Sequence, residues 1–289
     1  MTGILYVVAT PIGNLDDISA RAIQVLGRVA RIAAEDTRHS ARLLQHLGIN
    51  THLVAVHDHN EAGKTQHLIS QLLAGDDLAL ISDAGTPLIS DPGYRLVAAA
   101  HEAKIQVVPV VGACAAIAAL SAAGLPSDRF SFEGFLSAKT TARQGQLQAL
   151  VHETRTLIFY EAPHRILECV QDMRAIFGEQ RRVVLARELT KTFETIKQMT
   201  LAELCDFVEA DTNQQRGEIV LVVEGAPADS ALAAQQEVDN LLLKLLKYLP
   251  VKASAQLAAE LTGHKKNALY DRALVLQRKR PAASPLFHY

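Results

Sequence analysis

The sequence predicts an α/β protein with two α/β domains and a small helical domain at its carboxyl end. Through the first half of the chain, short apolar runs alternate with segments of helical periodicity, which is the pattern of a mainly parallel sheet. The second half continues as another α/β unit, in which we expect antiparallel pairs as well. With 289 residues, 49% of them hydrophobic, the chain can bury a large core, and two domains are expected at that length.

The first domain is predicted to span residues 1–124. Its apolar runs predict strands at 4–9, 31–34, 52–56, 78–82 and 105–110. Helical spacing and closing glycines predict helices around 18–29 and 43–47 and at 61–74, 94–103 and 113–123. The segment 124–128, Gly-Leu-Pro-Ser-Asp, breaks this regularity, so we place the domain boundary there.

The second domain is predicted at 125–228 and the helical domain at 235–280. The second domain offers strands at 130–135, 156–160, 183–186, 194–199 and 218–224, with helices at 143–151, 165–177 and 201–209. Residues 226–230 read as a linker by composition. Beyond them, apolar residues at helical spacing flank a break at 262–264, which indicates two short helices around a glycine turn, as in a helix-turn-helix.

Composition narrows the class of protein. A formal net charge of -2 argues against a protein that coats nucleic acid everywhere, although a local basic face remains possible. The three cysteines form no CxxC pair, so neither a disulfide framework nor a zinc site is indicated, and the reducing cytoplasm fits. The amino terminus lacks a basic leader and breaks at Pro11, so we expect no export and no membrane anchor.

An elaborate loop follows the strand at 78–82. Residues 82–93, SDAGTPLISDPG, are far longer than a simple turn needs, and they begin where a parallel strand ends. In open parallel sheets, ligands bind outside the carboxyl ends of the strands. The loop therefore predicts a binding site; the alternative is a purely structural turn stabilised by local side-chain bonds.

Five motifs in register resemble the tetrapyrrole methylase superfamily, and within it the bacterial branch that methylates a cytidine ribose in the decoding region of small-subunit ribosomal RNA. They are ATPIGNLDD (9–17), AAEDTRHS (33–40), SDAGTPLISDPG (82–93), FYEAPHR (159–165) and ARELTK (186–191). The resemblance runs from Ile4 to about Leu276. It implies two α/β domains with S-adenosylmethionine in the cleft between them, a homodimer and a small helical domain. Relatives that act on corrins and porphyrins carry GxGxGD after the first strand, where this chain has residues 10–15, TPIGNL.

The resemblance also implies which residues meet the cofactor. They are Pro11, Asp83, Gly85, Pro87, Ile89, Ser90, Gly112, Cys114, Ala115, Tyr160 and Ala186. Small residues and the N–H groups opening the helix at 113–123 suit a carboxylate. The alternatives are that the small residues serve only tight packing, and that Tyr160 is a core tyrosine with a satisfied hydroxyl. The family usually has Pro-Gly where this chain has Val111-Gly112, so we expect a looser loop there.

The implied reaction displaces the sulfonium methyl by a ribose 2'-oxygen, and alignment with an assisting base suffices for it. We expect Glu35, Asp36 and Arg38 to act as base or phosphate contact, with Glu188 and Lys191 as further candidates. The alternative is that Asp36 or Thr37 caps the next helix and Arg38 pairs with Glu35. No metal is expected: the set His57, Asp58, His59 and Glu61 has no second ligand cluster and reads as a polar loop.

A basic cluster in the last helical segment predicts contacts with RNA phosphates. It comprises Lys265, Lys266, Arg272, Arg278, Lys279 and Arg280, opposed only by Asp271. Arg187 and Lys191, with Arg181, Arg182 and Lys197, extend it across the second domain. A solvated helix face is the alternative. We expect S-adenosylmethionine-dependent 2'-O-methylation of a cytidine in small-subunit ribosomal RNA; the alternatives are methylation of a tetrapyrrole precursor and a non-catalytic nucleic-acid-binding regulator that senses a small ligand.

Overall fold

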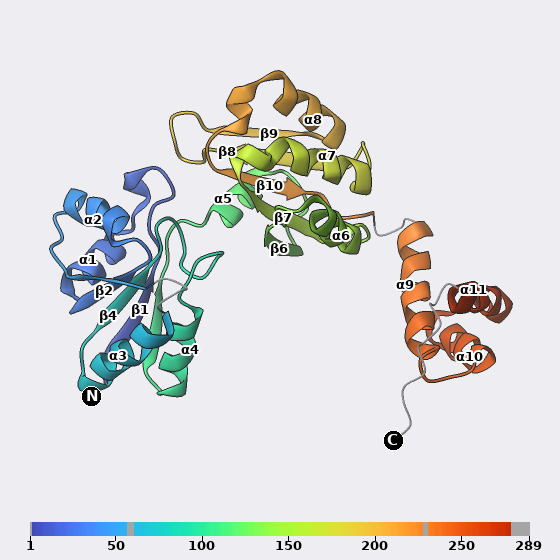
Figure 1. The fold of residues 1–289 in the computed structure, drawn as a ribbon, viewed down its shortest axis with the longest axis horizontal. Coiled ribbons are helices and arrows are strands. Elements are labelled where there is room, and N and C mark those ends of the chain that lie inside the picture. Colours follow the sequence, from blue (N-terminus) through green and yellow to red (C-terminus); the bar gives the residue numbers. More distant parts are fainter. Residues whose placement is uncertain (1, 57–60, 228–230, 279–289) are drawn as a thin grey trace. The chain divides into compact units, whose positions relative to one another are not determined.

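A computed structural model describes residues 2–56, 61–227 and 231–278. The chain divides into two compact units. The first, residues 1–148 with 155–224, holds two β-sheets; the second, residues 149–154 with the chain from 225 onward, holds a helical bundle (Figure 1). The predicted α/β class with a helical carboxyl-terminal part is confirmed.

The first sheet is entirely parallel, in the order β3-β2-β4-β1-β5. Its strands are β1 (Ile4–Val8), β2 (Arg31–Ala34), β3 (Leu53–Ala55), β4 (Leu78–Ile81) and β5 (Gln106–Val110). The connecting helices are α1 (Ala20–Arg28), α2 (Thr37–His46), α3 (Glu61–Ala74) and α4 (Tyr94–Glu102). Every predicted strand of the first half is confirmed to within two residues, because each apolar run is short and bounded by turn residues.

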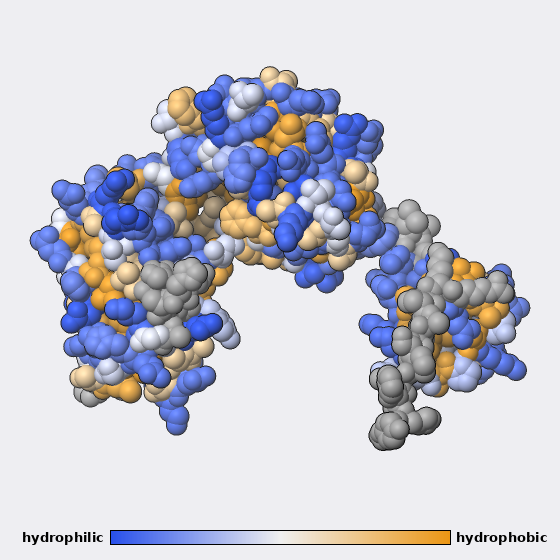
Figure 2. All heavy atoms as spheres, in the orientation of Figure 1, coloured by the Kyte–Doolittle hydropathy of each residue, from blue (hydrophilic) through white to orange (hydrophobic). Residues whose placement is uncertain are grey.

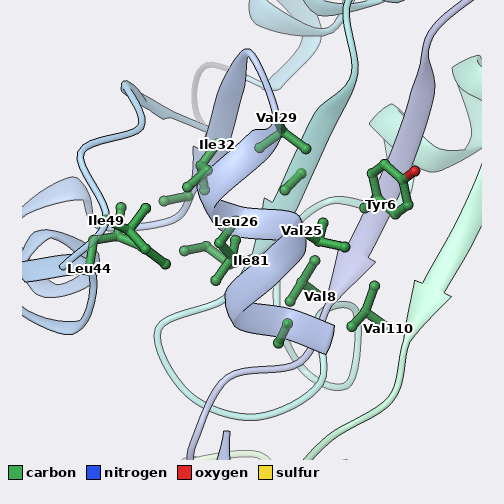
Figure 3. Packing of buried hydrophobic residues seen from close by; sticks show 13 residues of the cluster. Tyr6, Val8, Val25, Leu26, Val29, Ile32, Leu44, Ile49, Ile81 and Val110 are labelled. Atoms are coloured by element: carbon green, nitrogen blue, oxygen red, sulfur yellow. The ribbon is translucent and has the colours of Figure 1, made fainter. Parts of the chain in front are cut away.

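Both faces of this sheet are buried, which explains its nearly continuous apolar strands. Successive side chains alternate between faces: Tyr6 joins the core under α1 and α2, whereas Leu5 joins the core under α3 and α4. Figure 3 shows Val25 of α1 lying over Val8 and Val110 of the sheet. The parallel order brings the loops that follow β1, β2, β4 and β5 to one edge.

The second sheet is mixed, in the order β6-β7-β10-β8-β9. β6 and β7 pair in parallel and the other three pairs are antiparallel, as expected for the second half. Its strands are β6 (Phe130–Phe135), β7 (Thr156–Glu161), β8 (Arg182–Arg187), β9 (Thr195–Thr200) and β10 (Ile219–Val223). Its helices are α6 (Thr140–Leu150), α7 (Ile166–Phe177) and α8 (Leu201–Ala210).

Helix α5 (Ala115–Ala122) follows the first sheet in the chain but packs against the second sheet. The boundary drawn at 124 assigns it to the first domain, but its buried residues Ala116, Ala119 and Leu120 share a core with Ile158 and Val220 of the second sheet. The small side chains of α5 let the helix approach that sheet closely. By packing, the change from first to second sheet falls just before α5.

The helical unit consists of α9 (Ala231–Leu245), α10 (Val251–Thr262) and α11 (Lys266–Arg278). Gly263 ends α10 with φ 73°, a left-handed conformation that glycine adopts without strain. The predicted glycine turn between two short helices is therefore confirmed, and α9 packs against both. Figure 2 shows hydrophobic atoms at the surface of this unit on the face in view, and its exposed apolar side chains include Leu261 and Tyr248.

Among the described helices, none combines the length and the apolar character that crossing a bilayer would require.

Candidate functional site

Three loops are joined at the carboxyl edge of the first sheet. Thr10, after β1, and Gly85, after β4, exchange two backbone hydrogen bonds of 2.9 and 3.1 Å. Thr86 then donates from its hydroxyl to the carbonyl of Ala113, after β5, at 2.9 Å. The loop at 82–93 is thus held on both sides by its neighbours, and Thr86 tethers the segment that contains Val111.

The same loop contains unusual backbone angles. Leu88 and Ser90 have φ of 72° and 69°, in the left-handed region that costs non-glycine residues energy. Gly93 has φ 120°, and a Cβ there would lie 2.8 Å from the side chain of Leu80. Strain held by neighbouring loops is typical of ligand-binding segments. This favours the binding interpretation of the loop over a simple turn.

A first cavity of about 370 Å³ opens beside this loop, within the range of small-molecule sites. Seven of the residues predicted to meet a cofactor line it: Gly85, Ile89, Ser90, Cys114, Ala115, Tyr160 and Ala186. Pro11 and Asp83 line a neighbouring cavity instead. Pro87 is buried and lines neither cavity. Gly112 also lines neither; a Cβ there would lie 2.9 Å from the Cβ of Ala9, so close packing explains this glycine.

Carboxylates and aromatic rings characterise the first cavity. Asp91, Glu161 and Glu218 line it, and none of its described lining residues is cationic. Tyr160 and Phe135 provide ring surface, with ring centroids 5.6 Å apart. Such a cavity suits a ligand that combines a positive centre with a flat apolar group.

Tyr160 has two roles in the structure. Its hydroxyl oxygen accepts the backbone N–H of Ala116 at 3.1 Å, in the first turn of α5, where Cys114 provides no side-chain cap. Burial raises the pKa of Tyr160 to about 12, so the ring stays neutral at physiological pH. The predicted cofactor contact and its alternative, a core tyrosine with a satisfied hydroxyl, are thus compatible.

Asp91 is the cavity carboxylate with a perturbed titration. Burial raises the pKa of Asp91 to about 6; a hydrogen bond from Ser82 opposes the shift and the nearby charge of Asp83 adds to it. Glu161, by contrast, is 3% exposed and accepts from the guanidinium of Arg165 at 2.6 Å. The cavity therefore contains one buried carboxylate with an ion-pair partner and one whose charge depends on pH near 6.

The loop after β1 closes onto the loop after β8. The N–H of Asn14 donates to the hydroxyl of Thr190 at 2.9 Å. A Cβ on Gly13 would lie 2.5 Å from Cγ of Lys191 and 3.0 Å from the carbonyl oxygen of Leu189, so only glycine fits here. The PIGN and ELTK motifs, far apart in the sequence, thus form one contact across the two sheets.

A second cavity of about 550 Å³ has both Gly13 and Lys191 of that contact in its lining. It is lined by Pro11, Ile12, Gly13, Leu15, His39, Arg42, Leu43, Asp83, Ala84, Lys191 and Glu218. Ile12, Ala84 and Glu218 line both cavities. Lys191 donates to Glu188 at 2.9 Å and lies 3.2 Å from Glu218.

The residues predicted to be catalytic line neither cavity. Asp36 caps α2 by accepting the N–H of Arg38 at 2.8 Å, and its carboxylate also pairs with the Arg38 guanidinium. The side-chain hydrogen bond from Arg38 holds the pKa of Asp36 well below its usual range, which makes Asp36 a poor proton acceptor. The capping alternative for Asp36 is therefore confirmed, with Arg38 paired to Asp36 where Glu35 was expected.

His39 and Arg42 are cavity residues that the sequence prediction missed. They lie three positions apart on α2, and therefore on one face of the helix. The signals in the sequence are this spacing and, for His39, its place in the motif at 33–40; the spacing alone is weak, because exposed basic residues at helical spacing are common on protein surfaces.

The predicted RNA-contacting residues divide into three groups. Lys265 and Lys266 are exposed, as expected. Arg187 is a correction: its side chain is buried, and its guanidinium donates to Gln214, Thr195 and the Phe193 carbonyl, so it braces the sheet. Arg272 pairs with Asp239 of α9, an acidic partner that the sequence analysis did not identify, and its contact with RNA stays a prediction. Lys279 and Arg280 lie outside the described residues, as does the side chain of Arg278.

No group of three or more metal-ligating side chains occurs in the described part of the chain. His57, Asp58 and His59, considered above as a metal cluster, lie outside the described residues, as does the side chain of Glu61.

Comparisons with known proteins agree with this geometry. Residues 4–205 match the family described as Tetrapyrrole (Corrin/Porphyrin) Methylases, and residues 232–277 match the RsmI C-terminal HTH domain. The chain is 61% identical, over 96% of its length and 99% of the relative's, to a Pseudomonas aeruginosa protein named Ribosomal RNA small subunit methyltransferase I. A protein of the same name from Escherichia coli is 56% identical over 95% of this chain and 96% of its own.

Solved structures support the fold. The uroporphyrin-III-C-methyltransferase of Thermus thermophilus matches 77% of this chain and 94% of its own with a TM-score of 0.55 at 22% identity. The methyltransferase CobJ matches 78% of this chain and 95% of its own with a TM-score of 0.58 at 18% identity. With a family match over most of its length and a second over its helical unit, the chain belongs to the tetrapyrrole methylases and carries an RsmI-type C-terminal domain.

Proposed function

We propose that this protein transfers a methyl group from S-adenosylmethionine to the 2'-oxygen of a cytidine ribose in small-subunit ribosomal RNA. The observation that carries the proposal is the first cavity: apolar and aromatic, with three carboxylates and no cation among its described lining residues. This character matches a sulfonium compound that carries an adenine and an ammonium group. The high identity to proteins named Ribosomal RNA small subunit methyltransferase I supports the choice of acceptor.

Residues of both sheets would hold the donor. Gly85, with φ 84°, allows close backbone approach on one side, and Tyr160 and Ala186 close the other. The first turn of α5, which has no side-chain cap from Cys114, presents N–H groups to the donor's carboxylate. The bound donor supplies an activated methyl group, so alignment of the acceptor carries much of the rate.

The transfer balances without a further reactant. The ribose 2'-oxygen forms the new C–O bond as the methyl C–S bond breaks, and S-adenosylhomocysteine leaves as a neutral thioether. The hydroxyl proton passes to a base. Asp83 and Glu218, the carboxylates of the second cavity, are better placed for that role than Asp36, which lines neither cavity.

Transfer of labelled methyl groups tests the proposal. The protein is incubated with methyl-labelled S-adenosylmethionine and, separately, with unmethylated small ribosomal subunits, free ribosomal RNA or a precorrin. We expect label in 2'-O-methylcytidine after nuclease digestion of the RNA. Label on the precorrin would support tetrapyrrole methylation instead, and donor binding without transfer to any acceptor would support a regulator. Light scattering of the purified protein tests the accompanying proposal of a homodimer.

A further inference from the structure

The second cavity differs in charge from the first. Its cationic lining consists of His39 and Arg42 from α2 and Lys191 from the loop after β8. Lys191 is engaged by Glu188 and Glu218. His39 and Arg42 are exposed, and their side chains make no ion pair or hydrogen bond with other residues that the structure describes. Two basic groups on one helix face are thus available to an external anion.

The two cavities share a wall. Ile12, Ala84 and Glu218 line both, so a ligand in one cavity has its end close to a ligand in the other. The first cavity is acidic and suits a cationic methyl donor, whereas the second presents free basic groups and suits an anionic acceptor. The second cavity also contains the carboxylates Asp83 and Glu218, so the difference between the two cavities is the presence of Arg42 and His39 in the second and of no cation among the described lining residues of the first.

We propose that the second cavity is the acceptor-nucleotide site, in which Arg42 and His39 hold an RNA phosphate next to the reacting ribose. The inference rests on the proposed function. Arg42 suits a phosphate because the planar guanidinium donates two parallel hydrogen bonds to phosphate oxygens. His39, one turn before it, reaches the same anion from the same helix face. Phosphate contacts of this kind fix the register of the RNA backbone.

The size of the cavity adds a constraint on the acceptor. A volume of about 550 Å³ is large enough for one nucleotide. A nucleotide that leaves its stack would fit there, as in other enzymes that act on a single nucleotide. Leu15 and Leu43 provide apolar contact for the extruded unit.

Matched variants on neighbouring helices test this assignment. Arg42→Gln removes the guanidinium and His39→Gln removes the imidazole. Arg42→Lys keeps the positive charge but loses the two parallel N–H donors of the guanidinium. Arg21→Gln on α1 and His46→Gln at the end of α2 serve as controls, since both residues are exposed and line neither cavity. Full-length proteins are assayed with unmethylated small subunits and labelled S-adenosylmethionine, and donor affinity is measured separately by calorimetry.

We expect Arg42→Gln to raise KM for subunits about 10-fold or more, with donor affinity unchanged. Arg42→Lys should recover part of the loss. In Arg42→Gln, the slope of the logarithm of subunit affinity against the logarithm of salt concentration should decrease by about one, the value for one lost phosphate contact. His39→Gln should raise KM less, and both controls should behave as the unchanged protein. Equal KM for Arg42→Gln and Arg21→Gln would overturn the assignment while leaving the proposed function intact. Failure of the unchanged protein to methylate subunits would refute the proposed function itself.

Discussion

At the scale of single residues, the environment of a carboxylate decides its chemical use. Asp36, Asp91 and Glu161 are all acidic residues near the carboxyl edges of the sheets. An exposed arginine holds the pKa of Asp36 low, burial raises that of Asp91, and Arg165 pairs with buried Glu161. The EDTR motif identifies Asp36 but not its pairing with Arg38, and the loop at 82–93 is recognisable as a binding segment although its sequence does not show that Asp91 is the carboxylate whose pKa burial raises.

Asp91→Asn should change the pH dependence of the protein in a defined direction. The pKa of Asp91 rises from 3.8 to about 6 on folding, so its contribution to stability is complete below pH 3.8 and is lost as the pH rises through 6. The variant, measured by thermal unfolding, should therefore gain stability relative to the unchanged protein at pH 8 and not at pH 4. Affinity for the cationic donor should rise from pH 5 to pH 7 in the unchanged protein and stay flat in the variant. If stability and donor affinity depended on pH in the same way in Asp91→Asn and in the unchanged protein, Asp91 would not be the group responsible.

At the scale of elements, residues of the second sheet stabilise segments that follow strands of the first sheet in the chain. Helix α5 comes directly after β5 of the first sheet but packs on the second, and the hydroxyl of Tyr160 from β7 takes the place of its missing cap. Gly13 of the loop after β1 similarly fits against Lys191 after β8. These contacts bring together motifs that local sequence patterns treat as separate.

Tyr160→Phe should destabilise the protein by about 0.5–2 kcal/mol, because the Ala116 N–H in the first turn of α5 loses its acceptor. Urea unfolding measures the change. The ring remains, so donor affinity should fall only modestly. Tyr6→Phe provides a control of the same chemistry, since that hydroxyl accepts from Arg28 on α1 and not from a helix N–H. An unchanged unfolding free energy for Tyr160→Phe would show that α5 needs no cap.

At the scale of the whole molecule, the two cavities and the helical unit are built from different parts of the chain. All residues that line the two cavities belong to the first unit, and the core of α9, α10 and α11 is formed by residues of that bundle alone. The bundle carries exposed Lys265 and Lys266. We therefore expect the proposed donor binding and the proposed RNA binding to be separable by truncation.

Removal of residues 231–289 should leave affinity for S-adenosylmethionine nearly unchanged, because no cavity residue is lost. Methylation of small subunits should fall strongly as the basic helical unit is removed. Calorimetry and label transfer measure the two effects, and a circular dichroism melt confirms that the remainder is folded. Equal methylation by the folded truncated protein would refute an RNA-binding role for the bundle.

Local pattern was enough for the strands, the mixed character of the second sheet and the glycine turn at Gly263, because each depends mainly on neighbours within one element. The resemblance in motifs led to seven residues that line the first cavity, and their contact with a cofactor stays a prediction. Packing between distant segments decided the rest. It placed α5 on the second sheet, engaged Arg187 and Arg272 in ion pairs or hydrogen bonds, and put His39 and Arg42 beside a cavity. The sequence shows that a side chain is charged but not which group it pairs with. That partner is set by tertiary packing, because it comes from a residue far away along the chain.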